Sequence, residues 1–205
     1  MTVLYDYWRS SASYRLRIAL GLAQMEWDTV VVDLLSAQHT EQSYLSRNPQ
    51  GMVPTLEIDS EMLTQSLAII EYLDETRTLG FLPKDPLSKA RVRALSYAIA
   101  MDIHPICNLS VAKYAHQASD GAIPNPQWMG HFITKGLRAY EAMLAQGPYS
   151  YGAQITMADI CLMPQIYNAT RWEIDLIPMP KIRAIAERLQ NIPAFAQAHP
   201  DNCPR

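Results

Sequence analysis

Residues 9–22, which read RSSASYRLRIALGL, decide the fold of the first half of the chain. A short apolar run, Val3 to Trp8, comes before this stretch, and a valine-rich run, Thr29 to Leu35, follows it. Within the stretch, apolar residues recur at helical spacing from Ser11 to Leu22. The order therefore predicts a strand, a helix and a second strand.

Two more strands and a helix follow along the chain. The runs Thr55 to Ile58 and Met62 to Thr64 are separated by a short turn segment, which fits a hairpin. The text SLAIIEYLDE begins at Ser66 and has apolar residues at helical intervals, with Ser66 as the expected cap. Together these elements predict an α/β domain over residues 1–80, with one mixed four-stranded sheet flanked by helices.

The second half contains only helical patterns. Residues 81–88 hold two prolines and break the periodicity, so we expect a linker there and an all-helical domain over residues 89–205. The first long helix is interrupted near Pro105, because proline lacks an amide proton. Thr156 and Asp159 predict a capping box. Further helices are expected over about 126–146, 157–170 and 178–197.

The composition argues against several classes of protein. The net charge is −3, and the basic residues are scattered, so we expect neither a nucleic-acid nor a membrane partner. No apolar run approaches the roughly 18 residues of a membrane span, and the first residues lack a signal-peptide pattern. We therefore expect a cytoplasmic protein. Cys107, Cys161 and Cys203 are widely spaced without a C-x-x-C motif, which predicts no metal site and no disulfide chemistry.

Ser10 and Ser11 stand where the first helix should begin. A serine at this place commonly accepts a hydrogen bond from an exposed amide, which contributes about 1 kcal/mol as a cap. Two serines exceed what one cap requires, and the positive potential of a helix start also favours an anion such as a thiolate. Capping and anion binding both remain open from these residues alone.

Two other segments carry groups that could hold a ligand. Pro54 pushes Val53 toward an extended conformation, so the backbone of Val53 can pair with an extended ligand. A turn before a strand explains the proline equally well. Gln65 and Ser66 stand at another expected helix start, where they could hold a carboxylate or simply cap the helix.

These segments, in this order, resemble the thioredoxin-like domain of the glutathione transferases. The stretches RSSASYRLRIALGL, NPQGMVPTLEID and QSLAIIEYLDE are similar to the zeta class, also called maleylacetoacetate isomerases. The resemblance continues through DIHPICNLS (102–110) and TMADICLMPQIYNATRWEIDLIPMP (156–180), so it covers nearly the whole chain. It implies a thioredoxin-like domain followed by the all-helical C-terminal domain of a glutathione transferase, and a homodimer.

The resemblance also implies a glutathione site. Ser10 and Ser11 take the positions of serines that contact the glutathione sulfur, and we favour Ser11 as the donor. The other positions that the resemblance implies are His39 near the glycyl end, Val53 beside a cis-proline at Pro54, Gln65 and Ser66 at the γ-glutamyl end, and His104, Asn108 and Ser110 bordering glutathione and the substrate cleft.

The activity implied is the glutathione-dependent cis–trans isomerisation of maleylacetoacetate to fumarylacetoacetate, a step of tyrosine and phenylalanine breakdown. Thiolate addition to the conjugated double bond permits its rotation. Arg9 and Arg171 match arginines that face the carboxylates of the substrate, which predicts a dicarboxylate or α-keto acid. Ala12 replaces a cysteine that many zeta enzymes carry, so no protein thiol acts at that position.

Three alternatives remain. A maleylpyruvate isomerase would use the same chemistry, although N-L-S at 108–110 lacks the extra arginines that some such enzymes carry there, which favours maleylacetoacetate. A broader glutathione transferase would act on α-halo acids or hydroperoxides. A non-catalytic binding module is disfavoured, because a scaffold has no need of a carboxylate clamp beside a thiol site.

Overall fold

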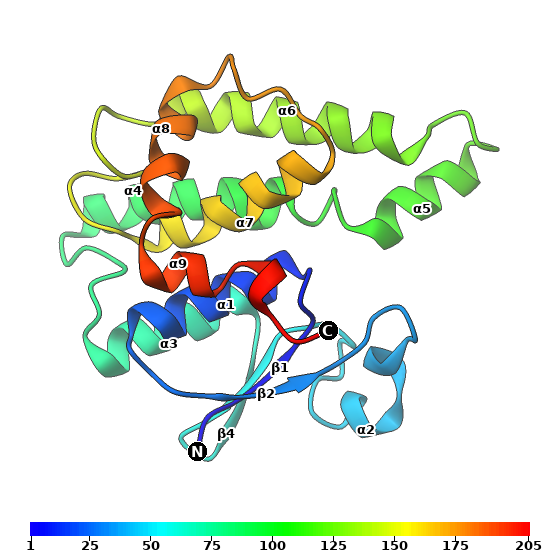
Figure 1. Cartoon of the computed structure of the whole chain (residues 1–205), viewed down its shortest axis with the longest axis horizontal. Coiled ribbons are helices and arrows are strands. Elements are labelled where there is room, and N and C mark those ends of the chain that lie inside the picture. Colours follow the sequence, from blue (N-terminus) through cyan, green and yellow to red (C-terminus); the bar gives the residue numbers. More distant parts are fainter. The chain divides into compact units, whose positions relative to one another are not determined.

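The computed structural model describes residues 1–205, which form two compact units. The first unit comprises Met1–Phe81 together with Gln190–Arg205, and the second comprises Leu82–Leu189. All strands belong to the first unit (Figure 1). None of the helices combines the length and the apolarity that a membrane span requires.

The first unit is built on a four-stranded sheet. Its elements are β1 (Val3–Asp6), α1 (Ser11–Leu22), β2 (Asp28–Val31), η1 (Gln38–Thr40), α2 (Gln42–Leu45), β3 (Thr55–Ile58), β4 (Glu61–Thr64) and α3 (Ser66–Arg77). The strand order is β2-β1-β3-β4, with β2 parallel to β1 and the other pairs antiparallel. The predicted mixed sheet is confirmed, whereas the short helices between β2 and β3 were not expected.

The register of the strands brings several connecting segments to one end of the sheet. Tyr5 pairs with Thr55, and Thr55 pairs in turn with Thr64. On the other side of β1, Asp6 pairs with Val31. The chain therefore leaves β1, β2 and β4, and enters β3, at this same end of the sheet.

Helix α1 is buried along most of its length. Leu16, Ile18 and Leu20 are fully buried, and α1 contacts both α3 and the short helix α9 (Pro193–Gln197). Gly21 permits the close approach of α9, since a β-carbon there would lie 3.2 Å from the Cβ of Ala194. Because neighbours cover it on several sides, α1 has no broad polar face.

The last residues of the chain were expected to form one helix over 178–197 and to belong to the domain of residues 89–205. The structure differs on both points. Helix α8 ends at Leu189, and Pro193 begins α9, which is followed by η3 (Pro200–Asn202). Phe195 is buried, and the segment lies along α1, as the red ribbon beside the blue helix shows (Figure 1). Its contacts therefore group it with the first unit.

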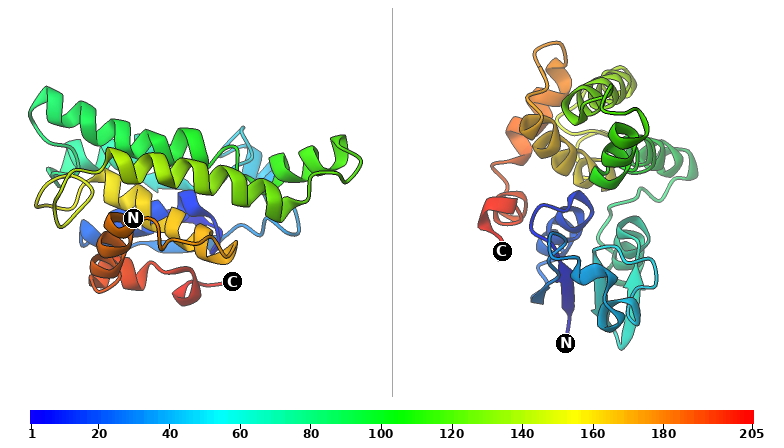
Figure 2. Two further views of the ribbon diagram at one scale, coloured as in Figure 1. Left: turned by 90° about the horizontal axis from the view of Figure 1, so that it is seen from above. Right: turned by 90° about the vertical axis from the view of Figure 1, so that its right-hand side faces the viewer.

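The second unit contains helices and no strand (Figure 2). Its elements are α4 (Pro86–Tyr97), the π-helical segment η2 (Ala98–Ile103), α5 (Leu109–Ala118), α6 (Asn125–Met143), α7 (Met157–Arg171) and α8 (Pro180–Leu189). The cap of α4 is Asp85, so this helix starts inside the segment expected as a linker. The interruption before Pro105 is confirmed, but α5 was not foreseen.

The start of α7 is fixed by the predicted capping box. Asp159 is fully buried, and its carboxylate accepts hydrogen bonds from the amide of Thr156 at 2.8 Å and from the amide of Ser150 at 2.7 Å. Burial raises the pKa of Asp159, and these hydrogen bonds act in the opposite direction. The carboxylate therefore ties the loop before α7 to the helix.

Replacing Asp159 by asparagine should destabilise the second unit. The Asp159→Asn amide group would face N–H donors, which leaves buried polar groups unpaired, and we expect the thermal midpoint to fall by about 5 °C. Circular dichroism melting measures the change. Asp175→Asn is the control, because exposed Asp175 also accepts one backbone amide, from Ile177 at 2.8 Å. Equal losses in the two variants would contradict the role of the buried carboxylate.

Candidate functional site

The two serines at the start of α1 have different roles. Ser10 is the N-cap, and its hydroxyl accepts a hydrogen bond from the amide of Ser13 at 3.2 Å. Ser11 is the first helical residue, half-buried, and its hydroxyl makes no hydrogen bond to another residue. One hydroxyl thus completes the cap while the other stays available, at a helix start whose first turn has no acidic residue.

Arg9 adds a positive charge immediately before this helix. Its guanidinium lies 4.6 Å from the centre of the Trp8 ring, and its Nη2 is 3.5 Å from the hydroxyl of Tyr7, at the outer limit of a hydrogen bond. The helix dipole and this cation act in the same direction. Both favour an anion beside Ser10 and Ser11.

The segment before β3 presents unpaired backbone groups. The Val53–Pro54 peptide bond is cis, as the resemblance implies, and the amide and carbonyl of Val53 make no hydrogen bond within the chain. The preceding residue is held firmly, because the carbonyl of Met52 accepts bonds from the Tyr44 hydroxyl at 2.6 Å and from the Asn48 amide group at 2.7 Å. An extended ligand could therefore pair with Val53.

His39 packs beside the same loop. Gly51 has a φ of +61°, and a β-carbon there would lie only 3.0 Å from the carbonyl oxygen of His39. The absence of a side chain at this glycine lets η1 approach the segment that precedes Val53. The Nδ1 atom of His39 is buried and has no hydrogen-bond partner.

The start of α3 corrects one expectation. Gln65, not Ser66, is the N-cap, with φ 68° and ψ 104°, and its side-chain amide donates to Gln50 Oε1 at 2.8 Å. This left-handed φ in a residue other than glycine turns the chain so that Ser66 becomes the first helical residue. The buried Ser66 hydroxyl accepts from Arg15 Nη1 at 3.1 Å. Its own proton remains available to a carboxylate.

The remaining predicted residues belong to the second unit. His104 follows η2, and Asn108 is the N-cap of α5. Asn108 Oδ1 accepts from the amide of Ser110 at 3.0 Å and from its hydroxyl at 2.9 Å, so both side chains take part in capping. Arg171 is the exposed last residue of α7, with its guanidinium 6.0 Å from the Tyr167 ring centre.

The thiols of the protein are poorly suited to act as nucleophiles. All three cysteines are free; Cys107 and Cys161 are buried and Cys203 is half-buried. Burial raises the pKa of Cys107 to about 11, and burial also raises the pKa of Cys203. Since the thiolate is the nucleophilic form, a raised pKa makes Cys107 and Cys203 poor nucleophiles at neutral pH.

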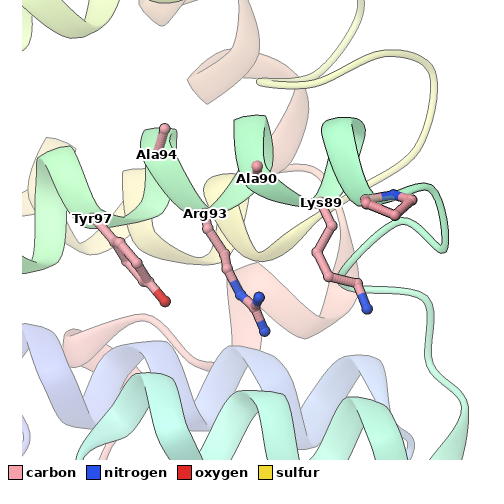
Figure 3. A pocket seen from close by; sticks show the side chains of 6 residues that line it. Lys89, Ala90, Arg93, Ala94 and Tyr97 are labelled. Carbon is pink, nitrogen blue, oxygen red and sulfur yellow. The ribbon is translucent and has the colours of Figure 1, made fainter.

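The second unit also has an open hollow along α4. It has a volume of about 440 Å³ and contains none of the predicted site residues. Its lining residues are Pro86, Lys89, Ala90, Arg93, Ala94 and Tyr97. Figure 3 shows that Lys89, Arg93 and Tyr97 extend from the same side of the helix. A hollow lined by one helix does not enclose a small molecule, so we assign it no catalytic role.

Sequence reasoning missed two arginines behind the site. Arg15 contacts Ser66, and Arg17 forms an ion pair with Asp6 at 2.7 Å, with both partners buried. The signal that could have found them is their place in the text YRLRIAL, where two charges interrupt a run of buried apolar residues. A charge in such a run requires a partner.

Comparisons with known proteins identify the family of the chain. The family model of the glutathione S-transferase N-terminal domain matches residues 2–75, and that of the C-terminal domain matches residues 102–197. The chain is 57% identical over 205 residues to maleylacetoacetate isomerase of Rhizobium meliloti, which covers 98% of this chain and 96% of that relative.

Two solved structures are also similar over nearly the whole chain. One is a maleylpyruvate isomerase described as a bacterial zeta-class glutathione S-transferase, with 38% identity, a TM-score of 0.94 and 98% of both chains covered. The other is a maleylacetoacetate isomerase from Methylobacterium extorquens AM1 with bound malonate and glutathione, with 33% identity, a TM-score of 0.92 and the same coverage. The chain therefore belongs to the glutathione S-transferase family, in the zeta class that includes the maleylacetoacetate isomerases.

Proposed function

We propose that the chain is a glutathione-dependent cis–trans isomerase that converts maleylacetoacetate to fumarylacetoacetate. The observation that carries the proposal is the start of α1, where Ser10 completes the cap and Ser11 keeps an unpaired hydroxyl at a helix start whose first turn has no acidic residue. Relatives with this activity in their names support the choice of reaction.

The groups at one end of the sheet fit a bound tripeptide. The unpaired amide and carbonyl of Val53 would pair with its backbone, next to the cis bond of Pro54. The Ser66 hydroxyl and Gln65 would hold the γ-glutamyl carboxylate, with the Arg15 charge behind them. His39, with its unpaired ring nitrogen, would lie near the glycyl end.

Ser11 would keep the bound sulfur ionised. When bound, glutathione supplies a thiolate that adds reversibly to the conjugated double bond and so permits its rotation. An ordinary thiol has a pKa of about 8.5, so only a few per cent is ionised at neutral pH. Hydrogen-bond donation by Ser11 and the positive helix start both favour the anion, so no histidine base is required.

The arginines would select the substrate. A guanidinium offers two parallel N–H donors that match a carboxylate, so Arg9 and Arg171 are assigned to the carboxylates and to the charge that develops on the adjoining carbonyl. His104, Asn108 and Ser110 are assigned to the border of the glutathione and substrate sites. The proposal includes a homodimer that works in the cytoplasm.

Maleylpyruvate is the second candidate substrate, because a similar solved structure is a maleylpyruvate isomerase. An absorbance assay with both cis substrates, with and without glutathione, tests the proposal. We expect turnover only with glutathione, and faster turnover of maleylacetoacetate. Cys107→Ala should leave the rate unchanged, since that thiol is buried and protonated. Equal turnover by thoroughly dialysed protein without added glutathione would refute the mechanism.

Ser11→Ala and Ser10→Ala separate thiol activation from capping. Ser11→Ala should raise the pKa of the bound glutathione thiol by about one unit and move the acid limb of the rate profile to higher pH. Its melting temperature should not change. Ser10→Ala should cost about 1 kcal/mol of stability with a smaller shift of the thiol pKa. Thiolate absorbance against pH measures the shift, and a larger shift in Ser10→Ala would reverse the assignment.

Arg171→Ala should impair use of the substrate and leave glutathione binding intact. Loss of a carboxylate partner predicts a fall in kcat/KM of at least about tenfold. Arg188→Ala is the matched control, because Arg188 is also exposed in the second unit, with its guanidinium 5.9 Å from the Tyr149 ring. Steady-state kinetics and a glutathione titration distinguish the two effects. A parallel loss of glutathione affinity would contradict the carboxylate role.

A further inference from the structure

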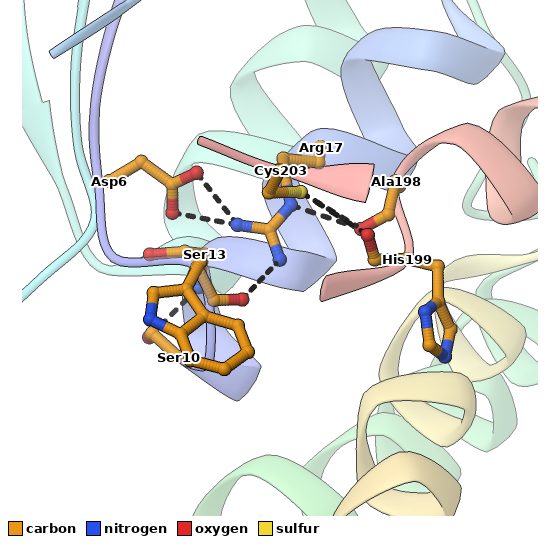
Figure 4. A network of polar contacts seen from close by, with 8 residues as sticks. Asp6, Ser10, Ser13, Arg17, Ala198, His199 and Cys203 are labelled. Carbon is orange, nitrogen blue, oxygen red and sulfur yellow. Dashed lines mark hydrogen bonds and ion pairs between the residues drawn. The ribbon is translucent and has the colours of Figure 1, made fainter. Parts of the chain in front are cut away.

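Arg17 is a buried cation on α1 whose hydrogen bonds join three parts of the first unit. It is 3% exposed, and its Nη1 donates to both carboxylate oxygens of Asp6 at 2.7 Å. Nη2 donates to the carbonyl of Trp8 at 3.0 Å, and Nε donates to the carbonyl of Ala198 at 3.1 Å. Figure 4 shows the guanidinium between Asp6 and Ala198.

These partners surround the turn that carries the two serines. Asp6 is the last residue of β1, and Trp8 stands two positions before Ser10. The amide of Ser10 donates to the carbonyl of Tyr7 at 2.8 Å, which closes the turn. The position of the Trp8 carbonyl is therefore coupled to the position of the helix start through a few fixed bonds.

The segment Gln190–Arg205 holds Trp8 from a second direction. The Arg205 guanidinium lies 4.5 Å from the centre of the Trp8 ring, while the Ala198 carbonyl accepts from Arg17. The thiol of Cys203 contacts the carbonyl of His199 at 3.3 Å, which helps to keep this segment turned back toward Arg17 (Figure 4). Arg205 thus contacts the indole of Trp8, and Ala198 binds the Arg17 guanidinium that also donates to the Trp8 carbonyl.

A buried ion pair is a weak source of stability by itself, because desolvation offsets most of the attraction between the charges. The geometry gives Arg17 a different use. Its planar fork donates to three acceptor groups, on Asp6, Trp8 and Ala198. A lysine ammonium at the same position could keep the charge but not these fixed directions.

We propose that Arg17 is a positioning residue for the isomerase reaction. It holds the Trp8 carbonyl between Asp6 and Ala198, and so fixes where the Ser11 hydroxyl meets the sulfur of glutathione. The inference rests on the proposed function and deepens its account of the same site. It makes the segment Gln190–Arg205 part of the thiol-activating apparatus.

Arg17→Lys in the full-length chain tests this role. We expect the pKa of the bound glutathione thiol to rise by about half a unit, which is about a threefold loss of thiolate at acidic pH, with a similar fall in kcat. Arg77→Lys is the control, because Arg77 also donates to both carboxylate oxygens of one residue, Asp59, at 2.8 and 2.6 Å. A purely structural role would lower the melting temperature without shifting the thiol pKa.

A second variant keeps the test decisive if Arg17→Lys fails to fold. The double substitution Asp6→Leu with Arg17→Met removes both charges and leaves no unpaired ion, so the variant should fold. It also removes the hydrogen bond from Arg17 to the Trp8 carbonyl. We expect the same rise of the thiol pKa. If the wild type lowers the pKa of the bound glutathione thiol below that of free glutathione and this folded variant lowers it equally, the inference about Arg17 is overturned and the proposed function stands. If the wild type itself does not lower the thiol pKa, both the proposed function and this inference are overturned.

Discussion

The register of the four strands is the constraint on which the rest of the first unit depends. Tyr5, Thr55 and Thr64 lie side by side across β1, β3 and β4, so the segments that continue from them meet at one end of the sheet. A slip of one residue in either pairing would turn every side chain of a strand to the opposite face. The capped start of α1, the cis bond at Pro54 and the turn at Gln65 would then no longer be arranged as the proposed glutathione site requires.

The burial of α1 adds a second constraint. A helix covered on several sides cannot keep a charge without a partner, and its two arginines donate to the Ser66 hydroxyl and to the Asp6 carboxylate. Both partners lie at the same end of the sheet as the serines. The hydrogen bonds that let charged residues lie on this buried helix are therefore made to segments that also carry the residues proposed to hold glutathione.

Local patterns predicted the elements that local interactions determine: the strands, the serines at the start of α1 and the capping box of Asp159. Three features were not predicted from the sequence, because they arise from tertiary contacts or from rare backbone angles. No sequence pattern indicates a left-handed φ at Gln65, so the N-cap of α3 was predicted at Ser66, one residue too late. The final segment joins the first unit through contacts with α1. Several site residues were singled out by their place at a helix start or beside a proline, but their roles came from resemblance. Arg17 was overlooked, because the partners of a charge within an apolar run are set by tertiary contacts.

The raised pKa values of Cys107 and Cys203 have a chemical consequence. The proposed substrates are electrophilic olefins, which alkylate any thiolate they meet. Cys107 has a pKa of about 11, Cys161 is fully buried, and Ala12 occupies the place where a thiol would stand closest to the serines. In the proposed reaction the nucleophilic thiolate belongs to glutathione, so a misdirected adduct forms on a diffusible and replaceable molecule instead of on the polypeptide.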